Sequence, residues 1–212
     1  MISLARATER RDRITRRLRA LGVSFEVVDA IDAMSVTEHE LDSAINRIRF
    51  WCEMGRDALP GEIACKLSHE KAWQQAGDET VCILEDDAEL DDLFSKELDN
   101  VAQLMDPEKS QVVLLSKNRY PLMFADGYVI TAKAREVLRK TNTPMRCPCD
   151  FWFKWRKAGI IDAWHHETAV VSQDISQTTI GRTKSLCQMN IVETAFWALK
   201  RLIGKTLGAL MP

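Results

Sequence analysis

Three consecutive carboxylates, Glu85, Asp86 and Asp87, directly follow a continuous apolar run over residues 80–84. Adjacent carboxylates repel one another, and none gains from burial unless a cation or hydrogen-bond donors lie nearby. A hard divalent cation, Mg²⁺ or Mn²⁺, resolves that conflict and bridges naturally to a diphosphate. In a strand Glu85 and Asp87 would point the same way and Asp86 the opposite way. We therefore expect Asp87 to bind the metal directly and Glu85 to support the metal or a ribose. Asp86 would contact the backbone or the groups that surround the metal ligands. The alternative is a solvated acidic turn.

A further carboxylate, Asp150, stands next to Phe151 and Trp152. A carboxylate within hydrogen-bond reach can take the proton of an attacking hydroxyl group. Aromatic faces suit a sugar ring, and they raise the pKa of a neighbouring acid towards the working range. We therefore expect Asp150 to be a general base. The alternative, compatible with the first, is an N-cap for a helix over residues 151–157.

Other polar residues are candidates for binding a nucleotide. Arg6 and either Arg10 or Arg11 follow the first expected strand; the alternative for them is a solvated first turn of a helix. Asp29 and Asp32 follow the second expected strand, and the chemistry of a turn explains them nearly as well. His69 stands beside Ser68, and its alternative is a structural histidine. Gln173 is the last candidate. Of the adjacent His165 and His166, at most one can reach a metal from a strand.

The expected elements place these residues on an α/β fold. A strand over 1–4, a helix over 8–21 with Thr8 as N-cap and a strand over 24–28 form a βαβ unit. A helix from Pro60 to about Gly77, strands over 80–84, 112–115 and 127–130, and a helix over 132–140 follow. A fully apolar strand is typical of a central, mostly parallel sheet, whose carboxyl edge binds ligands. The acidic triplet lies at that edge.

The bulk composition narrows the function classes. With 212 residues the chain suits one domain, and its net charge of −2 gives no field that attracts nucleic acid. The start lacks a secretory pattern, and no apolar run approaches the roughly 20 residues that span a bilayer. We therefore expect a cytoplasmic protein. Among the six cysteines only Cys147 and Cys149 are closely spaced, and this pair alone does not supply the four ligands of a structural zinc site. Because we expect a reducing compartment, we expect the cysteines to be free thiols.

The tail differs from the rest of the chain. Over residues 191–210 apolar side chains alternate with Lys200, Arg201 and Lys205 at helical spacing. A basic amphipathic helix is a common form for attachment to an anionic membrane surface. The alternatives are a helix packed on the domain or one that pairs with a second copy in a homodimer. We expect a catalytic domain over 1–185 and this C-terminal helix over 186–212.

Five segments, taken in order, resemble one family. They are residues 2–11, 59–69 (LPGEIACKLSH), 83–87 (ILEDD), 127–131 (GYVIT) and 149–152 (CDFW). Together they resemble glycosyltransferase family 25, the lipooligosaccharide galactosyltransferase-like group. The resemblance implies a GT-A-type fold, an inverting reaction, a Mn²⁺ or Mg²⁺ ion and UDP-galactose as donor. It also implies a lipopolysaccharide, lipooligosaccharide or other surface-glycan acceptor, and it places Gln173 in the last block, lining the cleft. The short span before residue 127 and the Ala125-Asp126 pair depart from the family pattern where acceptor contacts are expected.

Two rival functions remain open. A glycoside hydrolase needs two acids at a defined separation and gains nothing from a metal triplet. A nucleotide- or glycan-binding module of the same fold would bind UDP with a metal and show no transfer. An inverting transferase needs no protein nucleophile, which agrees with the lack of a Ser/His/Asp or Cys/His constellation in the sequence pattern.

Overall fold

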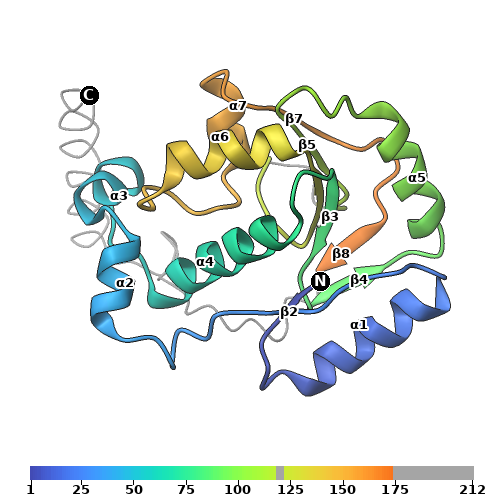
Figure 1. The fold of residues 1–212 in the computed structure, drawn as a ribbon, viewed down its shortest axis with the longest axis horizontal. Helices are drawn as coiled ribbons and strands as arrows, with labels where there is room; N and C mark the ends of the chain where they lie inside the picture. The colour runs from blue at the N-terminus through green and yellow to red at the C-terminus, as the bar shows by residue number, and fades with distance from the viewer. Residues whose placement is uncertain (118–121, 174–212) are drawn as a thin grey trace, which may run out of the picture.

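The computed structural model describes residues 1–117 and 122–173, and these form helices around a central sheet (Figure 1). The helices are α1 (Thr8–Ala20), α2 (Glu38–Ala44), α3 (Arg47–Met54), α4 (Pro60–Gln75), α5 (Phe94–Leu104), α6 (Ala132–Asn142) and α7 (Trp152–Lys157). The strands are β1 (Ile2–Ser3), β2 (Val28–Asp29), β3 (Val81–Leu84), β4 (Ala88–Leu90), β5 (Gln111–Leu114), β6 (Gly127–Ile130), β7 (Asp162–His165) and β8 (Val171–Gln173).

The N-terminal βαβ unit is confirmed. Strands β1 and β2 pair in parallel, with Ile2 opposite Val28, and α1 connects them. Helix α1 buries Ile14 and Leu18, which lie one turn apart on the same face. The predicted N-cap is wrong: Ala7 occupies that position and makes no side-chain capping bond. Helix α1 therefore begins at Thr8 without a side-chain cap.

The central sheet has the order β3-β6-β5-β7, and the prediction that it is mostly parallel is wrong. Strand β6 lies between β3 and β5 and is antiparallel to both, while β5 and β7 are parallel. A single bridge, Ile2 to Glu85, joins β1 in parallel to the end of β3. Strands β4 and β8 form a separate antiparallel pair. Consequently the first residue of β6 lies at the same edge as the last residue of β3.

Helices cover both faces of this sheet (Figure 1). On one face α4, α6 and α7 contribute Trp73, Leu138 and Trp152 to a buried cluster that includes Ile83 and Ile130. On the other face α1 and α5 pack against side chains such as Leu84, Val113 and Val129. Neighbouring strand residues alternate between the two clusters, as side chains along a strand must.

Helix α4 contributes more residues to the candidate site than any other helix or strand. It begins with Pro60 at its first turn, and the Glu62 carboxylate accepts from the backbone N–H of Leu59 while pairing with Arg56. Proline at this position loses no intrahelical hydrogen bond. Later turns of α4 are buried on most sides and include the polar residues Lys66, Ser68, His69 and Glu70.

The predicted C-terminal helix over 186–212 lies outside the described residues. Within the described part of the chain, no helix is both long enough and apolar enough to cross a membrane.

Candidate active site

A cavity of about 350 Å³ opens where β1 and β3 end, beside the first turns of α4. It is lined by residues from five segments: Ile2, Ser3, Leu4, Arg6 and Arg10; Ala30 to Met34; Leu59, Pro60, Gly61, Ala64, Cys65, Ser68 and His69; Glu85, Asp86 and Asp87; and Gln173. Most of the candidate residues found in the sequence therefore share one cavity. Asp29 and Asp150 do not line it.

The acidic triplet does not continue the strand. Strand β3 ends at Leu84, Glu85 makes the single bridge to Ile2, and Asp86 and Asp87 form the turn into β4. The predicted alternation of side chains is therefore wrong, and all three carboxylates reach the same cavity. Asp86 and Asp87 are also buried, at 5% and 7% exposure, so they are not a solvated turn.

Asp86 is the better compensated of the two buried acids. Its Oδ1 lies 2.9 Å from Nη2 of Arg10, and both side chains are buried. Burial raises the pKa of Asp86, although the neighbouring Ser3 and Leu4, together with the charge of Arg10, oppose that rise. Arg10 is thus a buried counter-ion of the triplet and not a solvated residue of the first helical turn.

Asp87 is less well compensated. Its Oδ2 accepts a hydrogen bond of 3.2 Å from Nε2 of Gln173. Burial, followed by the nearby charge of Glu85, raises the pKa of Asp87 to about 7. Among the described residues, Oδ1 of Asp87 and Oδ2 of Asp86 have no hydrogen-bond partner. Two buried carboxylate oxygens without donors match what a hard divalent cation needs as ligands, so the residues present fit such an ion.

Asp126 belongs to the same acidic cluster, and the sequence argument missed it. It directly precedes β6, its backbone oxygen accepts from the N–H of Glu85, and its side chain is 2% exposed. Oδ2 accepts from the hydroxyl of Ser116 at 2.9 Å, while Oδ1 has no partner among the described residues. Burial raises the pKa of Asp126 to about 6. The signal for it was its place before strand 127–130, which becomes informative only once that strand is known to be antiparallel.

His69 connects the core to the triplet. Its Nε2 lies 3.0 Å from Oε1 of Glu85, and its Nδ1 lies 2.7 Å from the hydroxyl of Tyr128, which also accepts from Nε1 of Trp73. Burial opposes the charged ring, but hydrogen bonds with Cys65 and Glu85 outweigh it and raise the pKa of His69 to about 10. The structural reading of His69 is therefore supported, because the ring holds Glu85 at the cavity wall.

Asp150 does not line the cavity, but it is close enough to Glu85 for their charges to interact. Burial, followed by the charge of Glu85, raises the pKa of Asp150 to about 6, while its own backbone N–H and that of Phe124 stabilise the carboxylate. It is not the N-cap of α7, since Phe151 occupies that position without a side-chain bond. Trp152 is not a sugar platform either: it is fully buried against Tyr128, at a ring distance of 4.9 Å.

The remaining candidates are paired with one another. Nε of Arg6 lies 2.5 Å from Asp32 at the cavity, and this hydrogen bond holds the pKa of Asp32 below its usual value. Asp29 instead pairs with Arg11, at 2.7 Å, outside the cavity lining. These pairs brace the loop after β2 against the start of α1.

The two adjacent histidines lie outside the described lining of the cavity. Nε2 of His166 lies 2.8 Å from Oε2 of Glu97 on α5, where both side chains are buried. His165 lies on β7, and neither residue lines the cavity.

A sequence profile described as "Glycosyltransferase family 25 (LPS biosynthesis protein)" matches residues 1–121, more than half of the 212 residues. The chain belongs to glycosyltransferase family 25. The matched part of this family 25 chain includes β1, α4 and the acidic triplet, which together form most of the cavity. Asp126, Asp150 and Gln173 lie beyond it.

Characterised relatives of this family 25 chain carry different descriptions. It is 31% identical over 113 residues to "Procollagen galactosyltransferase 2" of Homo sapiens, covering 49% of this chain and 18% of the relative. It is 31% identical over 109 residues to "Probable inactive glycosyltransferase 25 family member 3" of Rattus norvegicus, covering 49% of this chain and 19% of that relative. The similarity thus spans about half of this chain and under a fifth of each of these two relatives, one of which is named as inactive.

Proposed function

We propose that this chain is an inverting, metal-dependent glycosyltransferase of the GT-A type. It transfers a hexose, galactose from UDP-galactose, to a lipopolysaccharide, lipooligosaccharide or other surface-glycan acceptor. The observation that carries the proposal is the pair of buried carboxylate oxygens of Asp86 and Asp87, without partners in the described chain, at the wall of a cavity of about 350 Å³. Membership of family 25 and the galactosyltransferase named among its relatives support the reaction class.

Asp87 and Asp86 would hold Mn²⁺ or Mg²⁺, with Glu85 supporting the metal or the ribose. When bound, such an ion acts as a Lewis acid that neutralises charge on a leaving diphosphate. Arg10 favours the ionised form of Asp86 and holds it in place through their buried ion pair. Gln173 orients Asp87 by donating to its Oδ2, which leaves Oδ1 directed to the ligand.

The other parts of the cavity suit the nucleotide. Arg6 and Asp32 line the cavity together with the neighbours of Asp32 in residues 30–34, and they contribute to binding the uridine or ribose. His69 positions Glu85 through the 3.0 Å contact of its Nε2. Asp29 contributes indirectly, because its ion pair with Arg11 stabilises the same loop.

Asp150 acts as the general base that takes the proton of the acceptor hydroxyl. A base with a pKa of about 6 is ionised at neutral pH and retains enough basicity to accept a proton. The partly exposed rings of Phe151 and Phe153, 5.4 Å apart, provide an apolar surface next to it. In an inverting reaction the acceptor oxygen attacks the anomeric carbon as the diphosphate leaves, so no residue of the chain becomes covalently modified.

We place the catalytic domain at residues 1–185 and a separate amphipathic helix at 186–212. The proposed setting is the cytoplasmic face of a bacterial inner membrane, where the basic helix would meet anionic lipid; pairing of two copies is the alternative use of that helix. Nucleic acid is not an expected partner.

The first test is calorimetric titration of UDP into the full chain, with Mn²⁺ and then with a chelator. The expected result is binding that requires Mn²⁺ and is lost in Asp87→Ala. The matched control is Asp92→Ala, which removes an exposed carboxylate that pairs with Arg17 outside the cavity lining. Equal UDP affinity in Asp87→Ala and wild type would refute the metal site.

The second candidate function is a binding module that has lost turnover, and the relatives named as inactive favour its consideration. Both candidates predict binding of UDP with a metal. They differ in the release of UDP from UDP-galactose when an acceptor glycan is present. Metal-dependent UDP binding with no turnover across a panel of sugar donors and acceptors would favour the binding module.

A further inference from the structure

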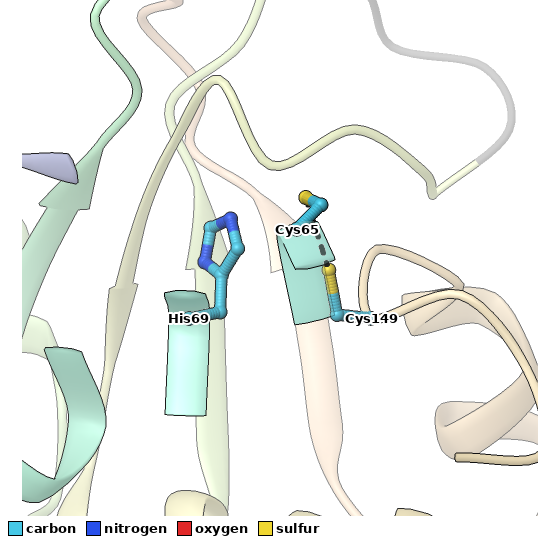
Figure 2. Close-up of side chains that lie close together, drawn as sticks. All are labelled: Cys65, His69 and Cys149. Carbon is cyan, nitrogen blue, oxygen red and sulfur yellow. Dashed lines mark hydrogen bonds between the residues drawn. The ribbon is translucent and has the colours of Figure 1, made fainter. Parts of the chain in front are cut away.

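Two thiols and one imidazole converge at the wall of the cavity, where Cys65 and His69 line it. Cys65 and His69 are four residues apart on α4 and so share one face of that helix. Cys149 arrives from the segment between α6 and α7, and Figure 2 shows its side chain pointing towards Cys65. One ligand atom from each of these three residues lies within 4.8 Å of the other two. The fold thus brings together side chains that are 84 positions apart in the sequence.

The spacing of these atoms suits a tetrahedral zinc ion. Two thiolates bound to one Zn²⁺ at about 2.3 Å lie roughly 3.8 Å apart. The sulfur atoms of Cys65 and Cys149 are 3.9 Å apart. Glu85 supplies an oxygen at the same place, since its Oε1 lies 3.8 Å from the sulfur of Cys65 and 3.0 Å from Nε2 of His69.

The histidine also has the outer contact that zinc ligands usually have. A ligating imidazole donates its other ring N–H to a nearby acceptor, which fixes the ring orientation. Here Nδ1 of His69 lies 2.7 Å from the hydroxyl of Tyr128, so Nε2 is the nitrogen available to an ion. The hydroxyl of Tyr128 is held in turn by Nε1 of Trp73 at 2.9 Å, within the buried core.

We propose that Cys65, His69 and Cys149 bind one Zn²⁺, and that Glu85 completes the coordination. This site goes beyond glycosyl transfer, and it shares Glu85 with the acidic triplet at the cavity. Soft thiolate ligands select zinc, whereas the oxygen ligands of Asp86 and Asp87 suit Mg²⁺ or Mn²⁺, so the two sites take different ions. Binding exchanges the two thiol protons and the Nε2 proton for the cation without any oxidation. The ion ties α4 to the segment that carries Asp150.

The test uses Co²⁺ as a spectroscopic substitute for Zn²⁺. The reduced, chelator-treated full chain is titrated with Co²⁺ and then with Zn²⁺. The expected result is a thiolate-to-cobalt charge-transfer band with strong visible bands of tetrahedral coordination, saturating at one equivalent and erased by Zn²⁺. Cys65→Ser and Cys149→Ser lose the charge-transfer intensity. The control Cys82→Ser retains it, because that thiol lies on β3 outside the cluster. Circular dichroism confirms that each variant is folded.

A second variant tests the outer contact. Tyr128→Phe removes the hydroxyl and leaves the three ligands, and it is expected to weaken Zn²⁺ affinity about ten- to a hundredfold in competition with a chelating dye.

Three results would overturn the proposal. They are a folded, reduced chain without a charge-transfer band at one equivalent, a band that persists unchanged in Cys149→Ser, and a Cys65–Cys149 disulfide whose reduction yields no Co²⁺ binding. None of these measurements uses a nucleotide, so failure here is distinct from failure of UDP binding.

Discussion

Arg10→Met tests how the acidic cluster is balanced. The guanidinium of Arg10 lies 2.9 Å from Oδ1 of Asp86, and only 9% and 7% of the two side chains are exposed. Its charge also lowers the pKa of Asp87 against the effects of burial and of Glu85. Methionine keeps most of the length and apolar stem of arginine and removes the charge. The substitution therefore leaves buried carboxylates without their counter-ion.

The expected cost follows from that burial. Removing one partner of a buried ion pair costs about 3–5 kcal/mol, because the other charge remains without compensation. In a chain of this size 1 kcal/mol changes Tm by about 2–4 °C, so Tm should fall by roughly 6–20 °C. The control Arg16→Met changes an exposed arginine of the same helix and should stay within about 0.5 kcal/mol of wild type.

Thermal melting followed by circular dichroism provides the assay, first with chelator and then with Mn²⁺. A cation at 100 times its dissociation constant stabilises the folded state by about 2.7 kcal/mol. Arg10→Met removes a positive charge, which leaves the acidic cluster with more net negative charge. Mn²⁺ should therefore raise the Tm of the variant by more than it raises the Tm of wild type. The reasoning fails if Arg10→Met melts like Arg16→Met, or if Mn²⁺ leaves the Tm of both proteins unchanged.

Three further predictions concern separate parts of the chain. Asp150 must be ionised to accept a proton, and its pKa is about 6, so kcat should fall about tenfold for each pH unit below pH 6. Asp150→Asn should lower kcat about 10²–10⁴-fold and flatten the pH profile of kcat. Gly127→Ala would place a Cβ 2.8 Å from Val171 and should cost about 1–3 kcal/mol in urea unfolding, whereas a cost near zero would show that Val171 can move. Glu70→Gln leaves the buried Lys66 ammonium without its 2.8 Å carboxylate partner, and guanidinium unfolding should show a loss of about 3–5 kcal/mol; a loss below 1 kcal/mol would contradict that.

The elements with strong local signals were predictable. Helix α4 begins at Pro60 as expected, and β3 coincides with the apolar run over 80–84. Helix α6 begins at Ala132, where the side chain of Thr131 caps it. In each case a residue type acts on its own neighbours, through a fixed φ, a cap or a continuous apolar stretch. Such signals survive in a single sequence.

Strand direction was not predictable, and it decided one member of the site. The residues of β6 read as an apolar strand in either direction. A parallel β6 would have put Asp126 at the edge opposite Glu85. Because β6 is antiparallel, Gly127 pairs with Leu84, and Asp126 joins the acidic cluster. The direction depends on how distant strands pack, which no local pattern records.

Side-chain groupings across long separations were equally hidden. The spacing of the cysteines offered no zinc site, since Cys147 and Cys149 alone provide too few ligands. The cluster arises because α4 lies against the segment before α7, which places Cys65 and Cys149 within 3.9 Å. In the same way, the burial of Asp86 depends on Arg10 from α1.

The same groupings indicate where a catalyst and a binding module of this fold should differ. In both proposals Asp86 and Asp87 would bind the metal and the diphosphate, so their burial does not separate the two functions. A general base is required only for turnover. Asp150 is held next to the cluster with its pKa raised to about 6, a cost that binding UDP alone does not require. Asp150→Asn should therefore leave metal-dependent UDP binding unchanged while it lowers transfer about 10²–10⁴-fold, and a parallel loss of both would assign Asp150 to the fold and not to the reaction.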